Sequence, residues 1–440
     1  MNTIGHILKL TVWGESHGPY IGGVIDGLPA GIYIDEVAIE KWMRRRWPDA
    51  PGITPRKEED DVEFVSGVRK DRTTGAPLAF MIKNTDPQAK EYSWAQDGFR
   101  PGAADLGLYY AHGEYRDVRG GGYVSGRATA VIAAAGAIVM PILERYGVSI
   151  TSRLSWLDGK QLETRGDNAL GIDKTEEDIV FDMLRQAEKQ KRGLESEVEV
   201  FVHGYPLGIG SPLFGALDSD LAHGVFSIPG VKGVLFPQGG DVVQDGDVIK
   251  DTTGIAGGFS VGDIAFRTMF KPPPSQGGVV IGFDGKKKNL SLRSDVCIAP
   301  RAMVVVESMA ALTLLDHWML RRTQEFLFGG GGIDELRSDI DEIDRRILDL
   351  VAERTGFAQD FAREKQKKKI DTKDDRRMSE RRSFFRKYAV RLGLDEESAA
   401  VLVDSLMLAS IKRQEAIRGE EPTSSKPPKP RTSPARKKKR

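Results

Sequence analysis

Four consecutive glycines, Gly329 to Gly332, divide this 440-residue chain into two parts of different composition. A glycine run carries a large entropic cost in any helix or strand, so it is typical of a hinge or linker. Residues 1–327 are rich in glycine, whereas glycine almost disappears from residues 334–418. An ordinary loop is the alternative, but the change in composition favours a domain boundary at 328–333.

The composition of the chain excludes several classes of protein. The 64 basic and 64 acidic residues cancel, so net charge points to no partner. Cys297 is the one cysteine, which rules out an internal disulfide and suits a reducing compartment. No signal peptide is recognisable at the start, and no run of 18 apolar residues occurs. We therefore expect a cytoplasmic protein without a membrane span.

Residues 1–327 contain short apolar runs between turns, among them YIGGVIDG, GGVVIGFDG and MVVVESMAALTLL. This pattern predicts mixed α and β structure. One longer helical pattern, ATAVIAAAGAIVMPILERYG, covers residues 128–147.

The second part is predicted to be helical. Its first helix is indicated by apolar residues at three- and four-residue spacing, namely Ile333, Leu336, Ile340, Ile343, Ile347, Leu350 and Val351. Two more helices are expected at 376–392 and 396–418. Residues 419–440 are rich in proline, serine and lysine, and we expect a disordered, solvated tail rather than a nucleic-acid contact.

The charges on these helices suit a dicarboxylate ligand. Arg354 and Lys365 are eleven residues apart, which places them about 20° from a common helix face. Ser410 and Gln414 share a face at a spacing of four, as do Asp374 and Arg377 at a spacing of three. Guanidinium forks, an ammonium and neutral donors would hold two carboxylates. The alternative is that these charges only solvate the helices.

The stretches DELRSDIDEIDRRILDLVAER, REK and ASIKRQ resemble the all-helical chorismate mutases. That resemblance implies a Claisen rearrangement of chorismate to prephenate, without a cofactor. It also implies that Arg337, Arg354 and Arg377 hold the carboxylates. Lys365 and Gln414 would bond the ether oxygen, and further family positions fall on Asp374 and Ser410. Met378 replaces a family glutamate, for which Glu380 or Asp375 are possible substitutes.

Gly14-Glu15-Ser16-His17-Gly18 is the strongest signal in the first part. It lies within TIGHILKLTVWGESHG, and GGVIDGLPAGI, TTGAPLAFMIKNTD, FRPGAADL, RDVRGGG, DLAHGVFSIPGVKGV, FKPPPS and RSDVCIAPRAM follow in order. Over about 320 residues these segments resemble chorismate synthase. The resemblance implies an α+β chain that begins with a β-α-β sandwich, usually assembled as a tetramer. It implies elimination of phosphate from 5-enolpyruvylshikimate-3-phosphate and a requirement for reduced FMN, for which NADPH is a candidate reductant.

A pocket for two phosphates and a carboxylate should be dense in arginine, lysine and glycine. The resemblance implies that His17 protonates the departing phosphate and that Asp295 relays a proton. Substrate would be held by Arg45 and Arg127. The FMN site would be lined by Ser125, Gly254, Lys271, Ser275 and Arg293.

The chain departs from the family pattern at several of these positions. Ala103 replaces a second catalytic histidine, and Tyr123, Val124 and Ala128 replace an arginine, a serine and a glutamate. Further departures fall on Pro51, on residues 191–196, and on Lys250 or Asp251. His112 could substitute for the missing histidine or be a surface residue. Three interpretations follow: a bifunctional enzyme, a synthase-like scaffold fused to an active mutase, or a different flavin-dependent lyase.

Overall fold

The computed structural model describes residues 2–53, 60–85, 94–238, 240–245, 248–274, 278–290 and 295–328, then single helical positions between 340 and 388, and residues 395–418. The chain forms two compact units, Met1–Gly330 and Gly331–Arg440. The proposed tail at 419–440 and most of the proposed linker lie outside the described residues.

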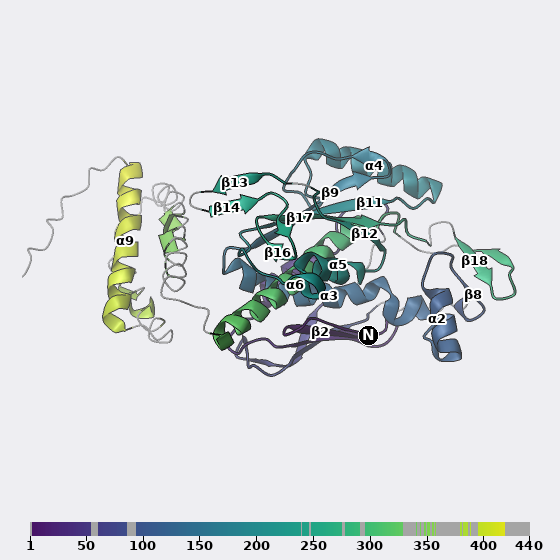
Figure 1. Ribbon diagram of the computed structural model, residues 1–440, viewed down its shortest axis with the longest axis horizontal. Coiled ribbons are helices and arrows are strands. Elements are labelled where there is room, and N and C mark those ends of the chain that lie inside the picture. Colours follow the sequence, from purple (N-terminus) through teal and green to yellow (C-terminus); the bar gives the residue numbers. More distant parts are fainter. Residues whose placement is uncertain are drawn as a thin grey trace, which may run out of the picture. The chain divides into compact units, whose positions relative to one another are not determined.

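Two antiparallel sheets enclose a layer of helices in the first unit (Figure 1). The first sheet has the order β1-β2-β3-β7-β4. Its strands are β1 (Thr3–Ile4), β2 (Lys9–Gly14), β3 (Tyr20–Asp26), β7 (Leu78–Lys83) and β4 (Val62–Ser66). The second sheet has the order β10-β9-β11-β17-β12. Its strands are β10 (Lys160–Gln161), β9 (Ser149–Leu157), β11 (Ser196–His203), β17 (Ile264–Phe270) and β12 (Val231–Leu235). The predicted β-α-β sandwich is present.

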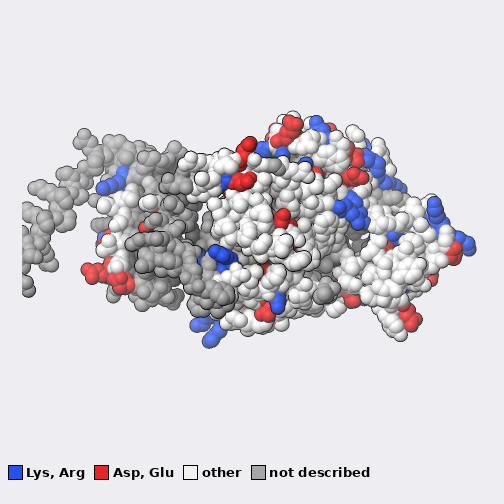
Figure 2. All heavy atoms as spheres, in the orientation of Figure 1, with Lys and Arg blue, Asp and Glu red and all other residues white. Residues whose placement is uncertain are grey.

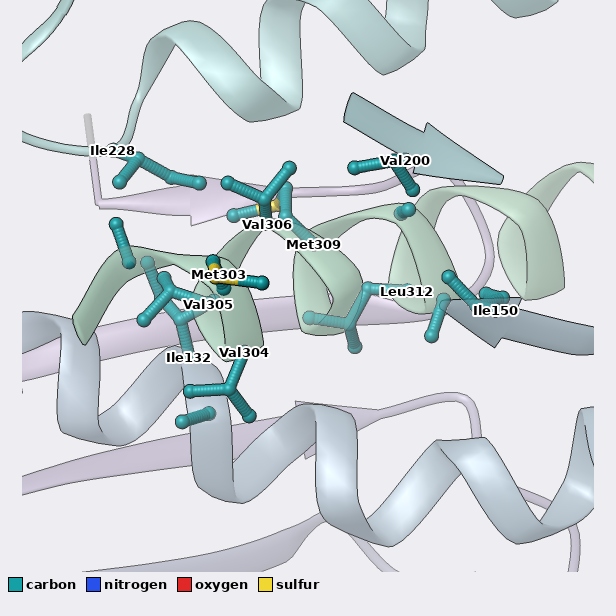
Figure 3. Close-up of a cluster of buried hydrophobic side chains, with 14 of the residues drawn as sticks. Ile132, Ile150, Val200, Ile228, Met303, Val304, Val305, Val306, Met309 and Leu312 are labelled. Carbon is teal, nitrogen blue, oxygen red and sulfur yellow. The ribbon is translucent and has the colours of Figure 1, made fainter. Parts of the chain in front are cut away.

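The central layer is built around α3 (Thr129–Glu144) and α6 (Ala299–Phe328). Helix α3 packs on β2, β3 and β7 of the first sheet, α6 packs on β9 and β11 of the second, and the two helices pack on each other. A Cβ on Gly136 of α3 would lie 2.1 Å from the Cβ of Ser308 in α6, so only glycine permits this approach. Figure 3 shows Met303, Val304, Val305, Val306, Met309 and Leu312 of α6 meeting Ile132, Ile150, Val200 and Ile228.

Helix α3 agrees with the helix predicted at 128–147. The 30-residue helix α6 was not predicted from the apolar run near its start. A helix buried on all sides has no polar face, so it lacks the period by which a surface helix is recognised. Two helices, Gly126–Glu144 and Ala299–Gln324, are long and apolar enough to cross a membrane. Their apolar windows are 72% and 83% buried inside the unit, as in the core helices of globular proteins.

Four more α-helices are described in the first unit: α1 (Glu36–Arg44), α2 (Asp105–His112), α4 (Lys174–Gln190) and α5 (Leu217–Phe226). Helix α1 packs on α3, and α5 packs on α6. Three small sheets have two strands each: β5 (Val68–Arg69) with β6 (Arg72–Thr73), β13 (Val242–Asp245) with β14 (Val248–Asp251), and β15 (Ile255–Ala256) with β16 (Phe259–Ser260). A fourth small sheet has three strands, in which β18 (Val279–Gly282) pairs with both β19 (Lys287–Asn289) and β8 (Gly98–Phe99). Figure 2 shows acidic and basic side chains interspersed over the visible face.

The described residues of the second unit are helical, apart from Asp395. Helix α9 (Glu396–Arg418), which is described over its whole length, has the bounds predicted from the sequence. Asp395 caps it, because its carboxylate accepts the Ser398 N–H over 2.8 Å. Gly393, the predicted stop of the preceding helix, lies outside the described residues.

Candidate active site

His17 lies in the tight turn between β2 and β3, where the Gly18 N–H donates to the Glu15 carbonyl over 3.0 Å. The Ser16 hydroxyl donates to the Arg119 carbonyl over 3.2 Å and lies 2.9 Å from His17 Nδ1. A hydroxyl has one hydrogen, so Ser16 Oγ must accept from Nδ1–H. In the neutral ring Nδ1 then carries the hydrogen, and Nε2 is the acceptor nitrogen.

A 3-10 segment, η3 (Arg119–Val124), packs directly on this turn. Gly120, Gly121 and Gly122 have φ of 59°, 89° and 57°, a region that favours glycine. A Cβ on Gly120 would lie 2.2 Å from Cε1 of His17. The glycine run is therefore needed both for its own backbone conformation and for the position of the histidine.

Asp117 and Arg119 form an ion pair beside the histidine. Arg119 donates to the carboxylate through its backbone N–H, Nε and Nη2, at 2.9 to 3.0 Å. Burial acts to raise the pKa of Asp117, but the bonds from Arg119 and the charges of Arg119 and His17 outweigh it and hold this pKa below its usual range. Asp117 is therefore an anion near His17.

A series of buried, hydrogen-bonded polar side chains supports the turn that carries His17. Asn84 donates through Nδ2 to the carbonyls of Glu15, over 3.0 Å, and Gly18, over 2.7 Å. Its Oδ1 accepts from Arg127 Nε over 2.9 Å, and Arg127 in turn pairs with Asp60. Neither Asn84 nor Asp60 was singled out from the sequence, although Asn84 lies within the quoted segment TTGAPLAFMIKNTD.

The structure changes the interpretation of Arg127, which was expected to hold substrate. Its side chain is 2% exposed and is bonded to Asn84, Asp60 and the Lys83 carbonyl. Asp60 also pairs with buried Arg46. Arg127 therefore supports the turn and does not face a ligand, because its positive charge is paired with the buried carboxylate of Asp60.

Arg45 follows α1, whose N-terminus is capped by Asp35. Its two terminal nitrogens donate to the buried Glu307 carboxylate at 2.6 and 2.8 Å, and the guanidinium lies 4.5 Å from the Trp42 ring centroid. Ser152 also donates to Glu307, over 2.6 Å. The Arg45 side chain remains 42% exposed, so it is held in place while part of it faces solvent.

Asp295, the predicted proton relay, is paired with Arg301 at 2.8 Å. Arg301 Nη1 also donates to the Arg46 carbonyl over 3.4 Å. Arg46 in turn pairs with Asp60, which belongs to the polar network below His17. Asp295 is therefore connected to that network through Arg301 and Arg46.

Lys271 lies against the loop that carries Ala103. Its ammonium donates to the Gly102 carbonyl, and burial, with a contribution from the charge of Lys232, lowers its pKa. In the same loop Arg100 pairs with Asp105 at 2.8 Å, and its Nη2 would lie 3.8 Å from a Cβ on Gly121. The structure thus connects Lys271 through this loop to the glycine run beside His17.

The residues expected to bind FMN are only partly brought together. Ser125 follows the glycine run, and its Oγ accepts from the Arg127 N–H over 3.4 Å. Gly254 packs on Asp263 and Ile264 at the start of β17, whereas Lys271 follows the end of that strand. The seven-residue strand separates them by about 23 Å. One chain therefore does not gather Gly254 with Lys271, and Ser275 and Arg293 lie outside the described residues.

Tyr123, which departs from the family pattern, contacts His112. His112 Nε2 lies 3.1 Å from the Tyr123 hydroxyl, and both side chains are exposed. Tyr123 replaces a family arginine, and His112 is the possible substitute for the histidine missing at Ala103. This polar contact joins α2 to η3, next to the loop that carries Ala103.

In the second unit, the structure brings together two residues predicted to bind substrate. Arg354 Nη1 donates to the Ser410 hydroxyl and to the Leu406 carbonyl, each over 2.5 Å. Ser410 lies on α9. Five further predicted residues lie outside the described set, in whole or by their side chains: Arg337, Lys365, Asp374, Arg377 and Gln414.

Comparison with known proteins agrees with both parts of the sequence interpretation. Residues 8–319 match the chorismate synthase family, and residues 336–415 match chorismate mutase type II. The chain is 38% identical over 354 residues to chorismate synthase of Archaeoglobus fulgidus, covering 73% of this chain and 98% of that protein. It is 36% identical over 357 residues to chorismate synthase of Porphyromonas gingivalis, covering 73% and 97%.

A crystal structure of chorismate synthase has a similar fold, with a TM-score of 0.55 at 23% identity over 72% of this chain and 93% of that one. These matches support enzyme activity in both parts, and they do not support the interpretation of the first part as a scaffold. The chain belongs to the chorismate synthase family and carries a chorismate mutase type II domain behind it, so that a lyase and an isomerase are joined in one polypeptide.

Proposed function

We propose that the first unit eliminates phosphate from 5-enolpyruvylshikimate-3-phosphate to give chorismate, and that the second unit rearranges chorismate to prephenate. The observation that carries the proposal is the His17 turn. A histidine of fixed tautomer lies beside an anion, Asp117, and is connected through η3 to Arg100 and Lys271.

His17 is the general acid in this proposal. Nδ1 is engaged by Ser16 Oγ, so Nε2 carries the proton that is given to the departing phosphate. Asp117 favours the charged imidazolium before transfer. Arg45 contributes a positioned guanidinium for an anionic group of the substrate, and Asp295 takes up the second proton.

The residues around η3 fit a phosphate-bearing cofactor. Lys271 is partly buried with a lowered pKa, and the Gly120–Gly122 run exposes backbone where a side chain would close the space. Reduced FMN, when bound, would supply electron density at the substrate ring, as members of this family generally require. Lys271 and Ser125 would hold it. Gly254 would contribute from a neighbouring subunit, since it lies at the other end of β17.

For the mutase step, the Arg354–Ser410 pair is the described part of the dicarboxylate site. Arg354 would bind a carboxylate of chorismate, and Ser410 would fix the orientation of the guanidinium. Lys365 and Gln414 would stabilise the charge on the breaking ether bond. This reaction requires positioning and electrostatic stabilisation alone.

The test is to incubate the full chain anaerobically with 5-enolpyruvylshikimate-3-phosphate and reduced FMN, and to follow chorismate and prephenate. We expect both to form in sequence. His17→Asn should abolish chorismate formation while leaving the mutase reaction intact when chorismate is supplied. Arg354→Ala should do the reverse. Prephenate from supplied chorismate, with none from the phosphate substrate under any reducing condition, would limit the activity to the mutase.

We further propose that the protein is a cytoplasmic homo-oligomer, a tetramer through the first unit and a dimer through the second. Arg337 would serve the partner's mutase site. Mixing inactive Arg337→Ala and Lys365→Ala chains should restore activity towards about a quarter of wild type if subunits pair at random and sites are shared. Subunit exchange without recovery would show that each site is built from one chain.

A further inference from the structure

His6, Asp220 and His317 converge from three distant segments of the first unit. His6 lies between β1 and β2, Asp220 lies on α5 and His317 on α6. One ligand atom from each lies within 4.8 Å of the others. His317 Nε2 is 2.8 Å from Asp220 Oδ2, and His6 Nε2 is 3.8 Å from the same oxygen. The proposed reactions use none of these side chains.

Asp316 sets the direction of the His6 ring. Its Oδ2 accepts from the His6 backbone N–H over 2.7 Å and lies 2.9 Å from His6 Nδ1, while Oδ1 accepts the Ile7 and Leu8 N–H groups at 2.8 Å. With Nδ1 engaged by this buried carboxylate, Nε2 points to Asp220. A histidine held by a carboxylate through one nitrogen, with the other facing a second ligand, is the usual arrangement beside protein-bound metals.

We propose that His6, Asp220 and His317 form a binding site for a divalent transition-metal ion of the zinc class. Two imidazoles and one carboxylate are ligands that such ions prefer. Metal–ligand bonds of about 2.0–2.1 Å in a tetrahedral site place ligand atoms about 3.3 Å apart. The two separations from Asp220 Oδ2, 2.8 Å to His317 and 3.8 Å to His6, bracket that value, so small side-chain rotations complete the site.

His6 has a side chain that is 51% exposed, whereas His317 is buried. The ion therefore has an entry path and an open position for water. The site is separate from the His17 turn, because β2 runs between them. Six strand residues span about 20 Å, with His6 before the strand and His17 after it. The ion would tie the N-terminal segment to α5 and α6, a structural role away from the reaction.

The competing explanation is a hydrogen-bonded cluster without metal, since His317 and Asp220 are already within bonding distance. The two explanations differ in their pH dependence. Protons compete with a metal ion for its ligands, so zinc affinity should fall as pH decreases. A hydrogen-bonded cluster would take up no zinc at any pH.

The experiment uses the full chain, stripped with a chelator and dialysed. Zn²⁺ is titrated by calorimetry at pH 7.5 and pH 5.5, and thermal unfolding is measured with and without the ion. We expect one ion per chain, micromolar or tighter affinity at pH 7.5, weaker binding at pH 5.5 and a Tm raised by several degrees. Co²⁺ in place of Zn²⁺ should give visible d–d bands that report the ligand set.

His6→Gln is the first variant, because it removes the imidazole ligand and keeps a polar side chain of similar size. It should weaken zinc binding at least tenfold, remove the Co²⁺ bands and leave chorismate formation unchanged. His223→Gln is the matched control, an exposed histidine on the same helix as Asp220, and it should bind as the wild type does. Absence of saturable zinc binding, or equal binding by His6→Gln and the wild type, would overturn the proposal.

Discussion

Arg127 donates through Nε to the side-chain oxygen of Asn84 over 2.9 Å, and this bond connects the buried charge network to the turn that carries His17. The amide nitrogen of Asn84 donates to the carbonyls of Glu15 and Gly18. The position of His17 therefore depends on side chains buried behind the turn.

Asn84→Ala should lower both stability and synthase rate. It leaves buried groups without partners, at about 1–3 kcal/mol for each such group, and it releases the His17 turn, for which a displacement of about 1 Å can cost up to about 10²-fold in rate. Urea unfolding and anaerobic chorismate formation measure the two effects. Asn168→Ala is the control, since Asn168 accepts the Leu170 and Ile172 N–H groups in another loop. The Asn168→Ala variant should lose stability and keep the wild-type rate of chorismate formation. An equal loss of rate in both variants would point to a general effect of destabilisation.

Ala103→His should raise the synthase rate. Ala103 lies in the Arg100–Asp105 loop that contacts Lys271, and an imidazole there would add a proton donor, an effect typically worth about 10²–10⁴-fold where the donor is missing. His112→Gln tests whether His112 already fills that role with Tyr123. A decrease in that variant, together with no gain from Ala103→His, would show that the proton path has moved to His112.

Asp117 should make stability depend on pH in the acid range. Its folded-state pKa is lowered, so its contribution is present above the ordinary value of about 3.9 and is lost as pH falls through the lowered folded-state pKa. Urea unfolding of wild type and Asp117→Asn should differ at pH 7 and converge below about pH 4. A constant difference over that range would show that the Asp117 carboxylate charge is not involved.

Arg354 and Ser410 should be coupled in the mutase reaction. Arg354→Ala removes a carboxylate ligand and should abolish most of the activity with supplied chorismate, whereas Ser410→Ala frees the guanidinium and should raise KM more than it lowers kcat. In the double variant the effects should not add, because both changes act on one interaction. Additive losses would place the two residues in separate roles.

Cys297 should not react with thiol reagents in the folded protein. Burial raises the pKa of its thiol to about 11, so the reactive thiolate is nearly absent at neutral pH. A chromogenic disulfide reagent should label about one thiol per chain only after unfolding, which provides a probe of global opening. Rapid labelling under native conditions would mean that the α6 end of the core opens locally.

The sequence pattern was sufficient for α3 and for α9, because each lies in a segment with a recognisable helical pattern, whereas the sandwich was expected from the resemblance to chorismate synthase. Helix α6 was not predicted, because apolar residues on all sides of a buried helix leave no helical period in the sequence. The same holds for Asp60 and Asn84, since short polar residues acquire their importance only when the fold buries them beside Arg127. Motif position gave the same expectation for Arg45 and Arg127, that each binds substrate, and could not show that Arg45 is partly exposed whereas Arg127 is buried.

The contact between Gly120 and His17 has a genetic consequence. Any missense change in the Gly120 codon adds a Cβ where the imidazole already lies, and it also forces a side chain onto a φ of 59°. Even alanine, tolerated at most surface positions, would displace the histidine or the loop. The codon should therefore behave as an all-or-nothing position in a saturation mutagenesis screen for growth without aromatic amino acids, in contrast to the neighbouring codon of exposed Tyr123.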